Sequence, residues 1–469
     1  MNSIKFGTDG WRAIIADDFT VENVRRVAVA TARWVQQQNQ RGVAVIGYDC
    51  RFGGELFART AAQMLCAHNI KTYLAEGFVS TPMVSLAARH YGADIGVVIT
   101  ASHNPPSYNG YKLKGGHGGP SSPSVIAAVE ALIPEQVSTP TVSLQTYEAG
   151  GLLEYVDMEA LYLDHVRRHF DLELINQANF IVAYDAMFGA GQRVAPALLR
   201  NTILLHCDYN PSFKGQAPEP LDRNLAELAS AIRNAPGNVV GLATDGDADR
   251  LGMYDETGAF VDAHHIILLL IHYLHRYKKM NGKVVVAFSV SDKVKKMCLH
   301  YGLPVEVTPI GFKYISEKMV KEDVLLGGEE SGGIAVKGHI PERDGIWDGL
   351  LLLEFMARTG KSLRELIREV YDVVGSFSFN RLDLHLDEEL KQKIIANCRE
   401  GRYRSFGRYT ILRTEDLDGF KYHFSNDEWV MIRPSGTEPL LRVYGEAPSS
   451  QAVSGMLQTV KQALLENET

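Results

Sequence analysis

The chain has 469 residues, of which 45% are hydrophobic and 22% charged, and its formal net charge at pH 7 is -8. This length exceeds what one hydrophobic core usually supports, so we expect three or four domains. The negative charge argues against general nucleic-acid binding. The densest apolar run, residues 266–271, is too short to span a bilayer, so we expect no membrane partner.

The cysteines and the N-terminal residues bear on location. The five cysteines are scattered and form no CxxC pair, which is typical of reduced thiols in a cytoplasmic protein. The first ten residues contain no apolar h-region, so we expect no secretory signal. Both features favour a cytoplasmic location.

Helix-like and strand-like segments alternate along most of the chain, which is typical of α/β layers. A helical pattern covers residues 21–38. Three later runs are rich in Val and Ile and end at a polar or small residue, as buried strands do: 43–49, 180–186 and 283–289. A helical pattern at 292–301 follows the third run. The three runs hint at three similar α/β units.

Two other segments have the composition of loops, and the C-terminal part of the chain has a different pattern of helices and strands. Residues 103–123 are crowded with Gly, Pro, Ser and Asn and predict a long turn-rich segment. Residues 134–151 are similarly loose and could link a first domain to a second. After residue 374 the pattern changes to shorter strands and two helical stretches, 387–399 and 450–465. We interpret this last part as a separate α+β domain.

A first chemical motif, Thr100–Pro105, directly follows the apolar strand predicted at 95–99. It places Ser102 at the carboxyl end of a buried strand, where α/β folds commonly bind ligands. The alternative is an ordinary strand-to-turn junction, in which Ser102 or Asn104 bonds the backbone.

A second motif holds three carboxylates, Asp245, Asp247 and Asp249. At this spacing they repel one another when desolvated, and a divalent cation resolves that repulsion. An EF-hand is excluded because its sixth position is Arg250 rather than glycine and the flanks read as strands. Ligation by a few carboxylates favours Mg²⁺. A solvated acidic turn is the alternative.

Two further motifs follow predicted strands. Residues 327–333, GGEESGG, combine glycines that allow close backbone approach with a carboxylate and a hydroxyl that could hold sugar hydroxyls. Residues 433–439, RPSGTEP, combine an arginine, two hydroxyls and the amides around a glycine, which suit a phosphate. Each motif alone could equally be a plain turn.

In this order, TASHNP, DGDADR, GEESGG and RPSGTEP resemble the motifs of the α-D-phosphohexomutase superfamily, in particular its bacterial phosphoglucomutase/phosphomannomutase branch. The resemblance extends over the chain, from GTDGWR at residues 7–12 onward. It implies three similar α/β domains with mixed sheets and a C-terminal α+β domain, arranged as a heart around a central active-site cleft.

The resemblance also implies which loop each domain contributes. Domain I, residues 1–150, would bring the phosphoserine, and domain II, residues 151–256, the metal loop. Domain III, residues 257–373, would bring the sugar-binding loop, and domain IV, residues 374–469, the phosphate-binding loop. Composition alone gives the boundaries near 150 and 374 but not the one near 256.

By motif, the resemblance assigns roles to individual residues. Ser102 corresponds to the phosphoserine, whose phosphate would complete the Mg²⁺ ligands Asp245, Asp247 and Asp249. Lys112 corresponds to a general acid/base and Arg12 to a catalytic cleft arginine. The residues implied to bind substrate are Arg250, Gly311, Lys313, Glu329, Ser331, Arg433, Ser435, Gly436 and Thr437.

The implied activity is the interconversion of hexose 1-phosphate and hexose 6-phosphate through a phosphoserine enzyme and a bisphosphorylated sugar. One Mg²⁺ per chain and a hexose 1,6-bisphosphate primer would be needed, and the partners would be small hexose phosphates. Glu330, Lys313 and the absence of a histidine at Gly333 favour glucose, with mannose also open. No oligomeric state is predicted.

Three alternatives remain from the sequence. A glucose-1,6-bisphosphate synthase would use the same serine, and a phosphoglucosamine mutase shares the RPSGTEP loop. A sugar-phosphate-binding protein without catalysis is the non-enzymatic alternative. The intact Ser102, Lys112 and three aspartates argue against the last of these.

Overall fold

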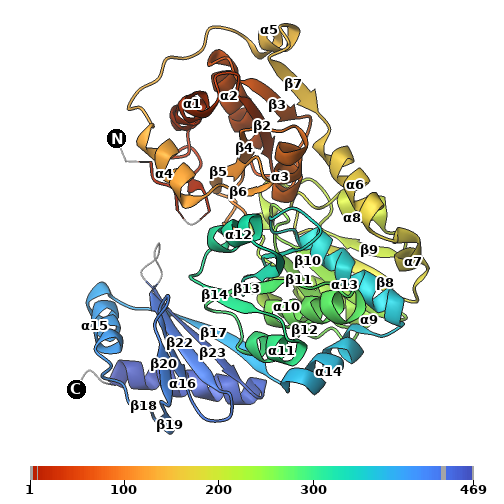
Figure 1. Ribbon diagram of the computed structural model, residues 1–469, viewed down its shortest axis with the longest axis vertical. Helices are drawn as coiled ribbons and strands as arrows, with labels where there is room; N and C mark the ends of the chain where they lie inside the picture. Colours follow the sequence, from red (N-terminus) through yellow and green to blue (C-terminus); the bar gives the residue numbers. More distant parts are fainter. Residues whose placement is uncertain (1–3, 8, 435–439, 467–469) are drawn as a thin grey trace. The chain divides into compact units, whose positions relative to one another are not determined.

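The computed structural model describes residues 4–7, 9–434 and 440–466 (Figure 1). By its internal contacts the chain divides into two compact units. Unit 1 comprises Met1–Val285 and Gly311–Ile367, and unit 2 comprises Val286–Ile310 and Arg368–Thr469.

The first sheet of unit 1 has the strand order β1-β5-β4-β2-β3-β7, with β6 beside β5. Its strands are β1 (Trp11–Ile14), β2 (Val43–Tyr48), β3 (Lys71–Ala75), β4 (Ile95–Ile99), β5 (Tyr108–Gly115), β6 (Gly119–Pro120) and β7 (Leu153–Val156). Strands β4, β2, β3 and β7 are parallel to one another, whereas β5 and β1 run antiparallel to their neighbours. The sheet is therefore mixed, as expected.

Helices cover this sheet because their apolar faces need burial. They are α1 (Val21–Gln38), α2 (Gly54–Ala67), α3 (Thr81–His90), α4 (Pro123–Ala131) and α5 (Leu144–Ala149). The side chain of Thr20 caps α1 by accepting the Asn23 N–H at 3.2 Å, which fixes where that helix begins. Helices α1 and α2 pack on each other and share one apolar core with β2 and β4.

The prediction of a turn-rich segment over 103–123 is wrong for its middle part. Residues 108–115 form β5, which pairs with both β4 and β1. Its glycines and polar residues resemble a loop in sequence. However, Lys112 and Lys114 are fully buried against carboxylates, so their polarity does not place them at the surface.

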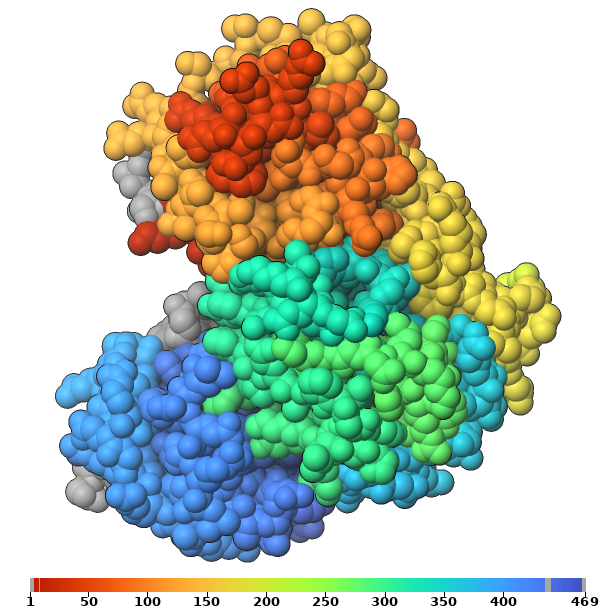
Figure 2. Space-filling model, in the orientation of Figure 1, coloured from red at the N-terminus to blue at the C-terminus, as the bar shows by residue number. Residues whose placement is uncertain are grey.

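The second sheet, also in unit 1, has the order β12-β11-β10-β8-β9. Its strands are β8 (Ile181–Asp185), β9 (Thr202–Leu205), β10 (Val239–Thr244), β11 (Leu251–Tyr254) and β12 (Phe260–Val261). Its helices are α6 (Met158–His169), α7 (Leu172–Gln177), α8 (Val194–Leu198) and α9 (Ala226–Asn234), with the short 3₁₀ turns η1 (Phe213–Gly215) and η2 (Asp222–Asn224). The α6–α7 segment, yellow in Figure 2, lies on the surface of this unit.

The third sheet has the order β14-β13-β15-β16, and the division between the units falls within β13. Its strands are β13 (Lys283–Ala287), β14 (Val305–Thr308), β15 (Val324–Gly328) and β16 (Ile334–Val336). The helices of this part are α10 (Ala263–His272), which continues as the π-helix η3 (Tyr273–Tyr277), α11 (Lys293–Tyr301), α12 (Phe312–Lys321), α13 (Gly345–Thr359) and α14 (Leu363–Val374).

The C-terminal part of unit 2 has a different construction. Its antiparallel sheet has the order β17-β23-β22-β21-β20. The elements are β17 (Ser378–His385), α15 (Glu388–Arg399), β18 (Ser405–Phe406), β19 (Tyr409–Thr410), β20 (Arg413–Glu415), β21 (Phe420–His423), β22 (Trp429–Pro434), β23 (Leu440–Ala447) and α16 (Ser450–Glu466). The two helices predicted here are confirmed, and the chain has the predicted class of α/β domains followed by an α+β domain.

None of the helices among the described residues combines the length and the apolarity that crossing a bilayer requires.

Candidate active site

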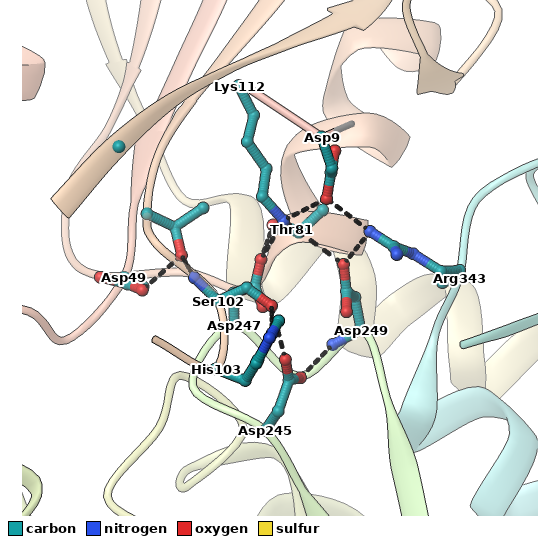
Figure 3. A network of polar contacts seen from close by, with 12 residues as sticks. Asp9, Asp49, Thr81, Ser102, His103, Lys112, Asp245, Asp247, Asp249 and Arg343 are labelled. Carbon is teal, nitrogen blue, oxygen red and sulfur yellow. Dashed lines mark hydrogen bonds and ion pairs between the residues drawn. The ribbon is translucent and has the colours of Figure 1, made fainter. Parts of the chain in front are cut away.

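Ser102 lies just beyond the carboxyl end of β4, whose five residues are all buried. It is 1% exposed and has a left-handed backbone, with φ of 52°. Its hydroxyl donates to Asp245 Oδ2 at 2.8 Å, and His103 Nδ1 lies 3.3 Å from Ser102 Oγ (Figure 3). The predicted position of Ser102 at a strand end therefore brings it to the predicted acidic motif.

That acidic motif is the loop between β10 and β11, two strands of the second sheet. Asp245, Asp247 and Asp249 are fully buried, and one carboxylate oxygen from each lies within 4.8 Å of the others. Asp245 Oδ1 accepts the N–H groups of Asp249 and Arg250 at 2.9 and 3.1 Å, which closes the loop. Gly246 is required here, because a Cβ on it would lie 2.5 Å from the Ser102 carbonyl oxygen.

Lys112, on β5, points into the acidic loop from the first sheet. Its Nζ lies 2.8 Å from Asp9, 2.9 Å from Asp247 and 3.5 Å from Asp249. Burial alone would lower the pKa of Lys112, but the three carboxylates outweigh it and raise that pKa. The side chain is therefore held as an ammonium.

Arg343 completes the network from the loop before α13. Its Nη2 donates to Asp249 Oδ2 at 2.5 Å and to Asp9 Oδ2 at 2.7 Å, and its Nη1 lies 3.7 Å from Glu329 Oε2. One guanidinium thus joins the N-terminal loop, the acidic loop and the predicted sugar-binding loop, as Figure 3 shows for the first two.

The carboxylates of the acidic loop differ in how well their charge is stabilised. Burial, and then repulsion from Asp247 and Asp249, raises the pKa of Asp245 well above its usual range. Burial also opposes ionisation of Asp247, but Lys112 and the hydroxyl of Thr81, 2.6 Å from Asp247 Oδ2, hold the pKa of Asp247 below its usual range. The neighbouring groups therefore stabilise the negative charge of Asp247 but not that of Asp245.

The donor atoms fit a bound divalent cation. Asp247 Oδ1 and Asp249 Oδ1 are buried and have no hydrogen-bond partner within the described part of the chain. Buried carboxylate oxygens are rarely left so unless an ion or water completes them. Oxygen-only donors of this kind suit a hard cation.

The two predicted cleft arginines also reach this region. Arg12, on β1, donates from Nη1 to Asn104 Oδ1 at 2.7 Å, and its Nη2 lies 3.7 Å from Asp9. Arg250 directs its Nε toward Asp245 and Asp249, 4.0 Å from each, and its Nη1 toward Glu219 at 3.4 Å.

Of the predicted sugar-binding residues, Glu329 has the best defined contacts. It directly follows β15, is 5% exposed and accepts the Gly311 N–H at 2.9 Å. Burial, only partly offset by Arg343, raises the pKa of Glu329 to about 7. Ser331 lies partly exposed two residues later.

Lys313, on α12, is partly exposed and borders a small cavity in unit 1. This cavity is lined by Asp9, Gly10, Leu113, Pro120, Ser121, Ile126, Phe312 and Lys313. Since Asp9 also contacts Lys112 and Arg343, the cavity borders the charged network.

The predicted phosphate loop belongs to unit 2. Arg433 is the last but one residue of β22 and pairs with Asp418, with Nε 2.9 Å from Oδ1. Asp418 also accepts the Ile310 N–H at 2.8 Å. Ser435, Gly436 and Thr437 lie outside the described residues.

The sequence analysis missed Asp9, Thr81, His103 and Arg343 as members of this network. Asp9 stands in the GTDGWR motif and His103 in TASHNP, so both signals were available. Arg343 lies in a charged triplet between apolar residues, a weaker signal. Thr81 is hidden as the first residue of α3.

A second cluster of possible metal ligands, formed by Asp292, Glu415 and His423 in unit 2, has a different character. Lysine ammonium groups already neutralise Asp292, with Lys295 at 2.8 Å and Lys421 at 3.3 Å from its Oδ1. Burial opposes ionisation of Asp292, but these lysines hold its pKa at about 2. It is therefore an ion-pair cluster rather than a cation site.

Comparison with known proteins identifies the family. Models of phosphoglucomutase/phosphomannomutase α/β/α domains I, II and III match residues 3–139, 160–258 and 262–374, and the model of the C-terminal domain matches residues 390–463.

Curated relatives and solved structures agree with the family models. The chain is 32% identical to the phosphoglucosamine mutase of Methanococcus maripaludis, with 89% of this chain and 90% of that one covered. It is 28% identical to a phosphoglucomutase/phosphomannomutase of Thermococcus kodakarensis, with 97% and 96% covered. A crystal structure of a candidate phosphomannomutase from Thermus thermophilus is 33% identical, covers 99% of each chain and gives a TM-score of 0.87.

The buried serine facing a three-aspartate loop is thus found on a chain whose four domains all match one family. The chain belongs to the phosphoglucomutase/phosphomannomutase family within the α-D-phosphohexomutase superfamily, and it is an enzyme of the phosphotransferase mutase class.

Proposed function

We propose that this enzyme interconverts hexose 1-phosphate and hexose 6-phosphate through a phosphorylated Ser102. The observation that carries the proposal is the 2.8 Å contact between Ser102 Oγ and Asp245, inside a fully buried set of three aspartates. A serine hydroxyl bound to a cation site is placed to accept and return a phosphoryl group.

In this reaction phospho-Ser102 donates its phosphoryl group to the free hydroxyl of a hexose monophosphate. The resulting bisphosphorylated sugar turns around and returns its other phosphoryl group to Ser102. A hexose 1,6-bisphosphate would also prime an unphosphorylated enzyme. Phosphoryl transfer depends mainly on positioning and on neutralising charge, which the cations around Ser102 can supply.

Lys112 is the group best placed to move a proton. Its Nζ lies among Asp9, Asp247 and Asp249, which hold it as an ammonium, so it starts as a proton donor. Arg12, fixed by Asn104, and Arg250, beside Asp245, add positive charge for the phosphate oxygens.

Mg²⁺ is the cation that these residues suit best. Asp245, Asp247 and Asp249 would hold it, with the phosphate of Ser102 as a further ligand. When bound, it would neutralise charge on the transferring phosphoryl group.

Glucose phosphates are the proposed preferred substrates. The proposal of a glucose preference rests on Glu330 and on Gly333, both in the loop after β15. Within the same loop, Glu329 and Ser331 are proposed to bind sugar hydroxyls.

The Arg433 loop, with Ser435, Gly436 and Thr437, is proposed to bind the phosphate that is not transferred. Gly311 and Lys313 are proposed to contact the substrate, and the cytoplasm remains the proposed location.

Glucosamine phosphate is the second candidate substrate. It is favoured by a specific observation, the 32% identity to a phosphoglucosamine mutase over most of both chains. A bisphosphate synthase would use the same serine but would consume a separate phosphoryl donor and release the bisphosphate.

A substrate panel with a serine variant tests the proposal. Glucose, mannose and glucosamine 1-phosphates are assayed with and without glucose 1,6-bisphosphate, and the Ser102 peptide is analysed by mass spectrometry. We expect turnover to be highest with glucose 1-phosphate once the enzyme is primed, and Ser102→Ala to lower kcat by about 10⁴-fold or more, because the phosphoryl acceptor is lost.

Ser107→Ala is the matched control, because Ser107 is an exposed serine on the same loop. It should retain the wild-type kcat. Full activity in Ser102→Ala would contradict the mechanism, and a higher kcat/KM with glucosamine 1-phosphate would replace glucose as the substrate. Release of bisphosphate in proportion to an added donor would identify a synthase.

A further inference from the structure

Arg51 occupies an unusual position beside the Ser102 loop. It lies between β2 and α2, and its side chain is fully buried. Strand β2 is parallel to β4, with Tyr48 opposite Ile99, so the carboxyl ends of the two strands are adjacent. The chain beyond β2 is thereby placed beside the chain beyond β4, where Ser102 lies.

The guanidinium of Arg51 binds the backbone of that loop at four points. Its Nη2 donates to the carbonyl oxygens of Ser102 at 2.5 Å and Asn104 at 2.7 Å. Its Nη1 donates to those of Pro105 at 2.9 Å and Tyr108 at 3.1 Å. A planar fork with several donors can gather four carbonyls in this way, and an ammonium cannot do so with the same geometry.

The backbone N–H of Ser102 is also bound, by a side chain that the β2–α2 connection holds in turn. The Ser102 N–H donates to Thr100 Oγ1 at 2.9 Å, and Thr100 Oγ1 donates to Asp49 Oδ2 at 2.5 Å. Asp49 Oδ2 in turn lies 3.3 Å from Arg51 Nε. Figure 3 shows Asp49 beside this segment. The C=O of Ser102 is therefore fixed directly by Arg51 of the β2–α2 connection, and its N–H is fixed through Thr100, which Asp49 of that connection holds.

These bonds act on a residue with a strained backbone. Ser102 has φ of 52°, a conformation that non-glycine residues adopt at a cost and keep only when their surroundings impose it. In this conformation the hydroxyl reaches Asp245 Oδ2. Release of the carbonyls would let the loop relax and turn the hydroxyl away from the acidic loop.

Phe213, in the 3₁₀ turn η1, covers the guanidinium of Arg51. Its ring lies 5.0 Å from Arg51 Cζ, and its side chain is 2% exposed. A guanidinium against an aromatic face is held in its plane and shielded from water, which keeps its hydrogen bonds directed at the loop.

We propose that Arg51 is a positioning residue for phosphoryl transfer, which holds Ser102 in its left-handed conformation by binding the carbonyls of residues 102–108. This role rests on the proposed function of Ser102 as the phosphoryl carrier. Arg51 itself contacts no reacting atom.

The test compares two buried arginines of the same domain. Arg51→Lys keeps the charge beside Asp49 but loses the fork. Arg26→Lys is the matched control, because Arg26 is 6% exposed and binds one backbone carbonyl, that of Pro134 at 2.7 Å, outside the Ser102 loop. We expect Arg51→Lys to lower kcat by about 100-fold, as a misplaced reacting group does. Its KM should stay within about twofold, because positioning affects the reacting group and not the bound sugar.

Two results would overturn the proposal. A kcat loss in Arg51→Lys no larger than in Arg26→Lys would reduce Arg51 to a packing role. A raised KM with an unchanged kcat would mean that Arg51 acts on substrate binding instead of on Ser102.

If Arg51→Lys does not fold, Thr100→Val tests the same network from the other side. It keeps the shape of the side chain, removes the bond to the Ser102 N–H and leaves Arg51 in place. It should show the same loss of kcat with an unchanged KM. A wild-type kcat in Thr100→Val would then contradict the proposal.

Hydrogen exchange separates this proposal from the function on which it rests. Peptides covering residues 100–110 should exchange faster in Arg51→Lys than in wild type, and should be unchanged in Arg26→Lys. A wild-type enzyme that turns over no hexose phosphate would refute the proposed function, while this comparison would still decide what Arg51 holds. Equal exchange in all three proteins would refute the positioning role.

Discussion

Ala248 stands between the second and third aspartates of the acidic loop with a left-handed backbone, φ of 56°. Ser102 shares this conformation, and so do Met187 and Phe188 in the loop after β8. The next residue, Gly189, approaches the Asp245 carbonyl so closely that a Cβ would lie 2.6 Å from it. Left-handed residues thus gather around the site, which is where folded proteins commonly retain such strain.

Ala248→Gly should therefore stabilise the enzyme. A left-handed backbone costs a residue with a Cβ about 1–2 kcal/mol, and glycine avoids this at an unfolded-state entropy cost of about 0.4–1 kcal/mol. We expect a net gain of roughly 0.5 kcal/mol in the free energy of unfolding, measured by urea denaturation.

Ala243→Gly is the control for this change, because Ala243 is equally buried nearby, within β10. It should destabilise the enzyme by about 1 kcal/mol, since a strand interior gains nothing from glycine. Equal destabilisation by the two substitutions would mean that packing of the Ala248 methyl group outweighs the backbone strain.

At the scale of elements, strands β21 and β23 bury charged side chains in unit 2. Lys421 is 1% exposed and lies 3.9 Å above the Trp429 ring, and Glu446 is also 1% exposed. Burial raises the pKa of Glu446 to about 7, with Ser291 and Lys421 partly opposing it. Asp292, which also faces this cluster, adds to the rise.

This pKa makes the stability of the enzyme depend on pH. Because the folded pKa of Glu446 lies above its usual value of 4.5, the folded state binds the proton more tightly than the unfolded state. Ionisation of Glu446 therefore leaves the free energy of unfolding unchanged below about pH 4.5. As pH rises towards 7 it lowers that free energy, and the loss levels off at about 3 kcal/mol.

Glu446→Gln removes the ionisation and keeps the shape. We expect its urea midpoint to match that of wild type at pH 4 and to exceed it clearly at pH 8. Glu389→Gln, at an exposed glutamate on α15, serves as the control and should follow wild type at both pH values. A constant difference between Glu446→Gln and wild type across this range would contradict the assignment.

Local sequence patterns predicted the strand ends that carry Ser102 and the three aspartates, because apolar runs and the residues after them are close in the chain. They failed for β5, whose buried lysines look like loop residues. They also missed Arg343, which binds Asp9 from 334 positions away. Such a contact depends on how the domains pack, and neither periodicity nor spacing carries that information.

On the scale of the whole molecule, the candidate active site is assembled by long-range charge pairs within unit 1. Lys112 comes from the first sheet, Asp247 and Asp249 come from the second, and Arg343 comes from the loop before α13. Nearby, Lys114 pairs with Glu342 at 2.7 Å with both side chains fully buried. Breaking such buried pairs is strongly destabilising, so the acidic loop keeps its geometry only while these parts are folded together.

Metal binding should therefore report on the folding of this unit as well as on activity. A ligand that binds only the folded chain adds about 2.7 kcal/mol to the free energy of unfolding at 100 times its Kd. We therefore expect saturating Mg²⁺ to raise the unfolding temperature by roughly 5 °C over that in EDTA.

EDTA should also abolish turnover of glucose 1-phosphate, and Mg²⁺ should restore it. Asp247→Asn removes a proposed ligand and should lose most of the thermal shift, whereas Asp17→Asn, at an exposed aspartate in the turn after β1, should keep it. Indifference of both the unfolding temperature and the activity to chelation would contradict the metal assignment. An equal shift in Asp247→Asn and wild type would instead place the cation elsewhere.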